Sequence, residues 1–229
     1  MSDKMALSYS RLSTFENCPA QFDYVNVSKS VSIRGSEAMD YGNRVHEVLE
    51  KHGKGELDAG VMTEEDTLSI KKWGSIVDVI TSRPGVKYFE YQMAINEKLE
   101  PVGWFDKDVY FRSIADVLVV DGDTAYCLDY KTGKVRESPT QLQFFAAIVM
   151  YHFPEVTTVK TSFIWLRFNQ TTNSEYQRRY LAPLWDALKP RLDAVHDAID
   201  LGVFDFKPSG LCPWCPAQDI CPNARKKHR

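Results

Sequence analysis

Four cysteines that are each followed by proline constrain this chain more than any other feature of its sequence. They are Cys18 near the N-terminus and Cys212, Cys215 and Cys221 in a C-x2-C-x5-C run near the C-terminus. Proline fixes its own φ angle and disfavours helix at the residue before it, so successive Cys-Pro steps predict a stiff, irregular loop. Such a loop can direct several thiolates toward one point. The fifth cysteine, Cys127, has no following proline, lies in an apolar stretch and is predicted to be a buried core thiol.

A group of four thiolates suits either an iron–sulfur cluster or a zinc ion. Zinc sites usually combine two short C-x2–4-C steps, whereas this chain has one short step, a gap of five residues and a distant upstream partner. The spacing therefore favours a [4Fe–4S] cluster over zinc, and four cysteines without any ligand are the third interpretation. The predicted cluster joins residues 1–35 to residues 205–229, so its binding energy would clip both chain ends onto the core, residues 36–204.

Composition and charge exclude several broad classes. The 229 residues are 44% hydrophobic and 26% charged with a net charge of −3, which excludes wholesale disorder and low-complexity sequence. The small negative charge argues against binding nucleic acid through overall charge, but it permits a local basic groove. Residues 1–10 lack an apolar signal core and no apolar run reaches the roughly 20 residues that span a bilayer. We therefore expect an intracellular protein with no membrane partner.

Hydrophobic periodicity predicts one α/β domain over residues 1–229, with a central mixed sheet flanked by helices. Helices are expected over residues 8–27, 36–52, 63–81, 138–151 and 183–201, and strands over 87–99, 108–120, 124–130, 157–168 and 174–181. Thr63, followed by three acidic residues, is a helix N-terminus signature. The segment Asp121-Gly122-Asp123 predicts a tight turn between two strands.

Two carboxylates and a lysine are predicted to meet on neighbouring strands. Side chains alternate along a strand, so Asp129 and Lys131 lie on the same face, and the preceding hairpin brings Asp116 beside them. Two close carboxylates repel unless a cation lies between them, and their hard oxygen atoms suit Mg²⁺ or Mn²⁺. The lysine can orient the attacking water or stabilise charge on a phosphate. The alternative is an ordinary salt bridge on a solvated strand face.

Basic residues follow this group in the sequence. Lys134 and Arg136 form a positive loop beside the acidic ligands, a combination that suits a phosphodiester substrate. The basic end, residues 225–229, either touches phosphate or is a solvated tail. His46 in a helix and Gln141 in the first turn of another are, taken alone, a histidine without a ligand and a plain helix-start amide.

Together these segments resemble the RecB-type nucleases of the PD-(D/E)XK superfamily, and in particular the iron–sulfur subset that includes AddB nuclease domains and CRISPR-adaptation nucleases. The similarity covers most of the chain and rests on the order and spacing of five motifs. These are the first cysteine helix (residues 8–19), YGNRVHE (41–47), IAD (114–116), LDYKTG (128–133) and QLQFF (141–145), followed by the C-terminal cysteine run. The resemblance implies a restriction-endonuclease-like core.

The resemblance also implies a role for each matching residue. The divalent metal would be held by His46, Asp116, Asp129 and the backbone carbonyl of Tyr130; Lys131 would activate water, and Gln141 would position Lys131 or the DNA backbone. The four Cys-Pro cysteines would hold the [4Fe–4S] cluster. The chain departs from the family where Ser113-Ile114-Ala115 replaces a glycine-containing step, and where Phe145 replaces the tyrosine of Q-x3-Y. Glu97, on the preceding strand, is one further candidate ligand.

The implied activity is a Mg²⁺- or Mn²⁺-dependent deoxyribonuclease, an exonuclease on single-stranded DNA ends with endonuclease activity left open. The resemblance suggests recombination, repair or phage DNA processing in the cytoplasm of a bacterial or phage-infected cell. No G-x4-G-K-[ST] phosphate loop occurs in the sequence, so a helicase or recombination protein would be a separate partner. The alternatives are a non-catalytic DNA-end-binding module and a zinc-stabilised structural or interaction protein. The oligomeric state is open.

Overall fold

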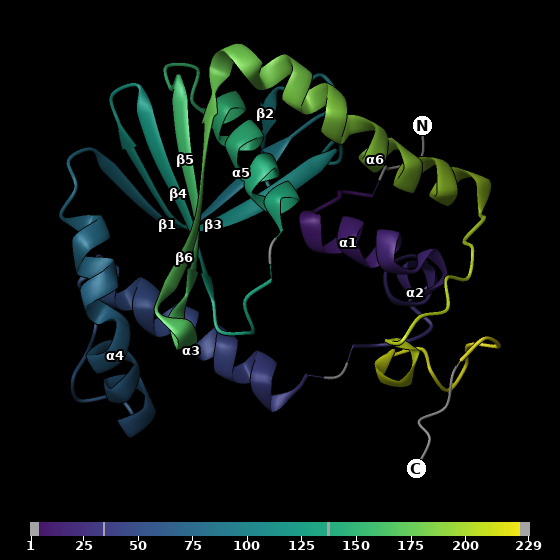
Figure 1. The fold of residues 1–229 in the computed structure, drawn as a ribbon, viewed down its shortest axis with the longest axis horizontal. Coiled ribbons are helices and arrows are strands. Elements are labelled where there is room, and N and C mark those ends of the chain that lie inside the picture. Colours follow the sequence, from purple (N-terminus) through teal and green to yellow (C-terminus); the bar gives the residue numbers. More distant parts are fainter. Residues whose placement is uncertain (1–4, 34, 137, 225–229) are drawn as a thin grey trace.

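A six-stranded sheet forms the centre of the computed structural model, which describes residues 5–33, 35–136 and 138–224 (Figure 1). Its strand order is β2-β1-β3-β4-β5-β6. The strands are β1 (Val86–Ile95), β2 (Pro101–Val102), β3 (Phe111–Asp121), β4 (Thr124–Lys131), β5 (Thr158–Trp165) and β6 (Gln170–Gln177). All neighbours pair antiparallel except β4 and β5, which are parallel. The predicted α/β fold with a mixed sheet flanked by helices is therefore confirmed.

Helices cover both faces of this sheet. They are α1 (Tyr9–Asn17), α2 (Pro19–Phe22), α3 (Glu37–Lys54), α4 (Glu64–Thr81), α5 (Pro139–His152) and α6 (Leu181–Leu201). One buried cluster joins the sheet to α1, α5 and α6, and a second joins its other face to α3 and α4. Helix α5 makes the crossover that the parallel β4–β5 pair requires. None of the described helices is long and apolar enough to cross a membrane.

Local sequence signals explain where several elements begin and end. Thr63 caps α4 in a complete capping box with Asp66, and the carboxylate of Asp66 also accepts two hydrogen bonds from Arg44 of α3. Helix α3 begins after a Ser36 cap and ends at Gly55, whose φ of 70° is left-handed. In the β3–β4 turn Gly122 has a φ of 58°, a conformation that glycine adopts without strain. These signals fix the two helices and the hairpin that surround the candidate site.

Helices α1 and α2, from the N-terminal part of the chain, lie beside the loop that follows α6 (Figure 1). The backbone N–H of Ala20 donates to the carbonyl of Asp205, and Lys207 Nζ donates to the carbonyl of Glu16. Glu16 also forms an ion pair with Arg191 of α6 at 2.6 Å. These contacts hold α1 and α2 against the C-terminal loop. The basic end at residues 225–229, expected either to touch phosphate or to be a solvated tail, lies outside the described residues.

Several predicted strand boundaries are wrong, most of all in the first and the last strand. The first strand ends at Ile95, because the side chain of Asn96 accepts hydrogen bonds from the N–H groups of Lys98 and Glu100 and turns the chain. The last strand covers Gln170–Gln177 and not residues 174–181, since residues 178–180 form a 3₁₀ turn that leads into α6. The first half of β6 was not predicted because its residues are polar and lack apolar alternation.

Candidate active site

Strands β3 and β4 separate at the candidate site. Their ladder runs from the turn only as far as the Val117–Leu128 pair, so Asp116 and Asp129 are the next residues, opposite each other, where the ladder stops. The N–H of Tyr130 donates instead to Asp116 Oδ2 at 2.5 Å. Both aspartates are buried, with 8% and 7% of their surface exposed. The site therefore lies in the opening between two diverging strands.

An imidazole reaches this opening from the α3 side of the sheet. His46 lies beside the buried stripe of α3 that contains Val45 and Leu49, and its Nδ1 is 3.2 Å from Asp116 Oδ1. The ring also meets the Tyr130 ring edge-to-face, with 5.9 Å between centroids. Burial lowers the pKa of His46, but the hydrogen bond to Asp116 and the nearby carboxylates outweigh burial, so its pKa is raised.

The close approach of α3 depends on a glycine one turn before His46. A Cβ atom on Gly42 would lie 3.1 Å from Thr132 Oγ1, in the segment that follows β4. A side chain at this position would fit only if Thr132 moved by a few tenths of an ångström. Gly42 therefore helps to set the distance between His46 and the end of β4.

A third potential ligand, Glu90 of β1, was not predicted from the sequence. Ligand atoms of His46, Glu90 and Asp116 all lie within 4.8 Å of one another, and they are the one such trio of His, Cys, Asp or Glu among the described residues. Glu90 has a left-handed φ of 46° inside β1. The signal available in the sequence was a carboxylate between two aromatic residues, Phe89 and Tyr91. Glu97, the candidate suggested by the sequence, lies beyond the end of β1 and is not part of this trio.

Asp129 and Lys131 form an ion pair on the α5 side of the opening. Lys131 Nζ is 2.5 Å from Asp129 Oδ2 and 4.9 Å from the centre of the Phe163 ring. Gln141 Nε2 in the first turn of α5 donates to Asp129 Oδ1 at 3.3 Å. Gln141 thus contacts the carboxylate that pairs with Lys131. The implied role of Gln141, to position Lys131 or the DNA backbone, stays a prediction. Phe145, in place of the family's tyrosine, is 1% exposed in the core.

Burial and crowding raise the pKa values of two of the carboxylates in the absence of a cation. Burial and the charge of Asp116 raise the pKa of Glu90 to about 7. Burial and Asp116 also raise the pKa of Asp129, although Lys131 works in the opposite direction. A bound divalent cation would remove this repulsion, and one imidazole with several carboxylate oxygens suits Mg²⁺ or Mn²⁺. The residues present therefore fit the metal that the motifs predict.

The four Cys-Pro cysteines line one pocket at the junction of the two chain ends, together with Tyr24, Phe206 and Lys207. Burial raises the pKa of Cys215, and the thiols of Cys18, Cys212 and Cys221 are close enough to raise it further. Cys127 is fully buried in the main core, away from this pocket. Lys134 and Arg136 are exposed in the segment between β4 and α5.

This arrangement can be compared with known proteins. A model of the PD-(D/E)XK nuclease superfamily matches residues 6–222. The chain belongs to the PD-(D/E)XK nuclease superfamily. The solved structure of a candidate exonuclease from Eubacterium rectale is 12% identical, with a TM-score of 0.58 over 100% of this chain and 92% of that chain. The crystal structure of SSO0001 is also 12% identical, with a TM-score of 0.48 over 96% of this chain and 88% of that one. No curated protein sequence matches the chain.

The structure places one more potential ligand at the site than the sequence motifs predicted. Glu90 adds a carboxylate to the predicted ligands, and its charge state makes a specific prediction about the metal-free protein. Its pKa of about 7 in the folded protein lies above the ordinary value of 4.5. The stability that Glu90 contributes is therefore fully present below about pH 4.5 and is lost as the pH rises through about 7.

Glu90→Gln removes this titration while keeping the side chain's size. We expect the metal-free variant to lose less unfolding free energy than the wild type between about pH 5 and about pH 8. Urea unfolding in the presence of EDTA measures this difference. Glu97→Gln, which changes an exposed glutamate just beyond β1, is the matched control. If the unfolding free energies of the wild type and Glu90→Gln depend on pH in the same way, the pKa of Glu90 is not raised in the folded protein.

Proposed function

We propose that this protein is a metal-dependent deoxyribonuclease that degrades single-stranded DNA from an end. The observation that carries the proposal is the trio of His46, Glu90 and Asp116 ligand atoms within 4.8 Å, beside the Asp129–Lys131 ion pair where β3 and β4 part. Crowded carboxylates next to a lysine suit a divalent cation and a phosphodiester. The exonuclease part follows the function suggested for the Eubacterium rectale structure.

Each residue of the site has a proposed task. His46, Glu90, Asp116 and Asp129 would hold Mg²⁺ or Mn²⁺, with the Tyr130 carbonyl as a further ligand. The bound cation would act as a Lewis acid and stabilise negative charge on the scissile phosphate.

The remaining residues act on the water and the substrate. Lys131 has three N–H donors, and the contact with Asp129 leaves two to orient the attacking water or a phosphate oxygen. Gln141 fixes the orientation of Asp129 through its hydrogen bond. Lys134 and Arg136, exposed beside the site, would neutralise phosphates further along the strand.

We further propose that the four cysteines hold a [4Fe–4S] cluster and not zinc. Zinc bound by four thiolates at about 2.3 Å would bring the sulfur atoms to within about 3.8 Å of one another. No three of the cysteine sulfurs, all of which are described, lie within 4.8 Å of each other. A four-iron cluster binds each thiolate to a different iron and therefore suits the wider spacing. The cluster would join residues 1–35 and 205–229 to the nuclease core, residues 36–204.

A digestion assay tests the proposed activity. Linear single-stranded DNA labelled at either its 5′ or its 3′ end, the corresponding duplex and circular single-stranded DNA are each incubated with Mg²⁺, Mn²⁺ or EDTA. We expect metal-dependent shortening of the linear single strand, slower digestion of the duplex, survival of the circle and no digestion in EDTA. The label that is released first gives the polarity. Unchanged digestion in EDTA, or binding without hydrolysis in both metals, would contradict the proposal. In recombination, repair or phage DNA processing, a helicase or recombination protein would supply the single-stranded end.

A further inference from the structure

The β5–β6 hairpin extends beyond the end of strands β4 and β5, which is the end of the sheet that carries Lys131 of the candidate active site. Lys131 at the end of β4 pairs with Trp165 at the end of β5, because these two strands are parallel. The chain then forms a 3₁₀ turn, Leu166–Phe168, and reverses at Asn169 in a left-handed conformation with a φ of 49°. Phe168 is therefore only three residues beyond the partner of Lys131. We define residues 166–169 as the hairpin tip.

The hairpin tip is anchored to α4 by a buried hydrogen bond, although its end is exposed. The indole N–H of Trp73 in α4 donates to the carbonyl of Leu166 at 2.9 Å, and both side chains are buried. Phe168, in contrast, has 46% of its surface exposed, and Arg167 is exposed beside it. An exposed ring next to a backbone that is anchored in this way offers a face on which a base can stack.

The surface next to Phe168 carries cations that no described carboxylate neutralises. Arg167 and Lys72 line one surface hollow together with Tyr41, Trp73 and Leu166. Neither cation takes part in an ion pair among the described residues, and Lys72 Nζ lies 5.7 Å from the centre of the Trp73 ring. An aromatic ring next to unpaired cations suits a single strand, whose bases stack and whose phosphates bind Arg and Lys.

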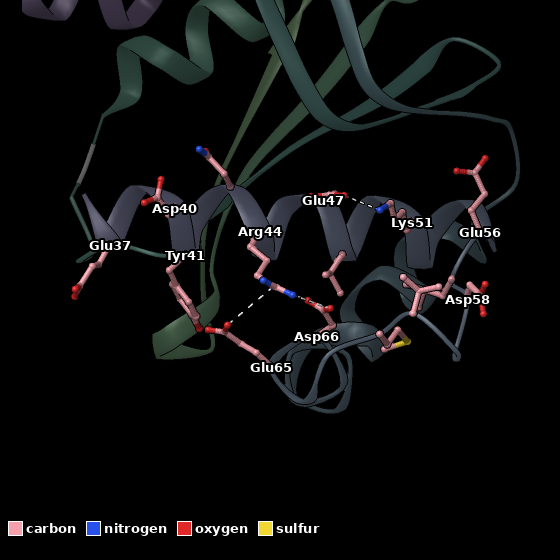
Figure 2. A pocket seen from close by; sticks show the side chains of 15 residues that line it. Glu37, Asp40, Tyr41, Arg44, Glu47, Lys51, Glu56, Asp58, Glu65 and Asp66 are labelled. Atoms are coloured by element: carbon pink, nitrogen blue, oxygen red, sulfur yellow. Dashed lines mark hydrogen bonds and ion pairs between the residues drawn. The ribbon is translucent and has the colours of Figure 1, made fainter. Parts of the chain in front are cut away.

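The neighbouring groove restricts where such a strand can pass. A long groove between α3 and α4 adjoins the hollow at Tyr41 and is lined by seven acidic residues (Figure 2). Its two cations are already paired, Arg44 with Asp66 at 2.8 Å and Lys51 with Glu47 at 2.6 Å (Figure 2). This acidic surface repels phosphate. A strand that leaves the site on this side is therefore directed across the hairpin tip and away from α3 and α4.

We propose that the hairpin tip is a single-strand binding subsite, in which Phe168 stacks on a base and Arg167 and Lys72 bind the adjacent phosphates. This inference rests on the proposed function, since it assigns the part of the nuclease that recognises unpaired DNA. In duplex DNA the bases are already stacked on one another, so Phe168 has no free base face to bind. The subsite thus gives a physical reason for a preference for single strands.

Binding measured without cleavage separates this proposal from the proposed function. All variants are made in the Asp129→Asn background, and the affinity for fluorescein-labelled oligothymidine and for a duplex of equal length is measured by fluorescence anisotropy in EDTA. We expect Phe168→Ala to weaken single-strand binding about 10-fold and duplex binding less than about 2-fold. Phe168→Tyr, which keeps the ring, should bind as the parent does. Arg167→Ala should weaken both and lower the slope of log affinity against log salt by about 1.

Phe105→Ala is the matched control, because Phe105 is 87% exposed but lies in the β2–β3 segment at the opposite edge of the sheet. The proposal predicts no change in binding for this variant. Single-strand affinity that survives Phe168→Ala, or an equal loss for duplex or for Phe105→Ala, would overturn the subsite. These outcomes do not depend on whether the wild type hydrolyses DNA, so the failure of one proposal is distinguishable from the failure of the other.

Discussion

Asp129→Asn should abolish DNA digestion while leaving the protein folded. The substitution removes one negative charge from the proposed metal site and keeps the shape of the side chain. Loss of a ligand that helps to hold the catalytic cation should slow hydrolysis at least about 1,000-fold, which corresponds to roughly 4 kcal/mol of barrier. The rate at saturating Mn²⁺, measured on end-labelled single-stranded DNA, checks this expectation.

Stability should not follow activity in this variant. Burial and the charge of Asp116 raise the pKa of Asp129, so an ionised carboxylate at this position weakens the metal-free fold. Neutral asparagine keeps the contact with Gln141 and should leave the melting temperature in EDTA unchanged or higher. Asp200→Asn changes an exposed aspartate of α6 and is the control for both measurements. Digestion by Asp129→Asn at the rate of the Asp200→Asn control would remove Asp129 from the catalytic site.

Cys215→Ser should have the largest effect on stability. Cys215 shares its pocket with Cys18 from the other end of the chain, so a cluster bound there couples α1 and α2 to the C-terminal loop. Structural metal sites contribute their binding energy to folding. We expect a loss of about 3 kcal/mol or more, which lowers the melting temperature by about 10 °C in a chain of this length. Thermal unfolding of the anaerobically purified protein measures the loss.

Colour and metal content distinguish the reasons for that effect. The wild type should be brown, contain iron and sulfide, and lose both in Cys215→Ser. Cys127→Ala removes the core thiol, which lies outside the pocket, and should keep the colour despite a smaller loss of stability. A colourless wild type that contains one equivalent of zinc would contradict the iron–sulfur proposal and support a zinc site. An unchanged melting temperature in Cys215→Ser would contradict both an iron–sulfur cluster and a zinc ion as a link between the two chain ends.

The parts of the fold that local chemistry specifies could be predicted from the sequence. Helix α4 begins at its Thr63 capping box, and the β3–β4 turn occurs at Gly122. Alternation along β4 correctly places Asp129 and Lys131 on one face, where they form an ion pair. Each of these features depends on residues that are close in sequence.

The missed features depend on contacts that residue spacing does not encode. Glu90 enters the site through a left-handed backbone conformation inside β1, which breaks the alternation that strand prediction assumes. Gln141 contacts Asp129 because α5 begins next to the end of β4. The order of the motifs in the sequence does not specify how close these two residues lie. Strand β6 was predicted four residues too late because its polar residues lack apolar alternation, although it pairs with β5 along its whole length.

Crystals grown with saturating Mn²⁺ would locate the proposed cation through an anomalous difference map. The structure predicts a peak within bonding distance of the His46 ring and of carboxylate oxygens from Glu90, Asp116 and Asp129. The peak should disappear in the Asp116→Asn variant. A map with no peak at this position, or with Mn²⁺ bound only at the acidic groove between α3 and α4, would contradict the assignment of these residues to a metal centre.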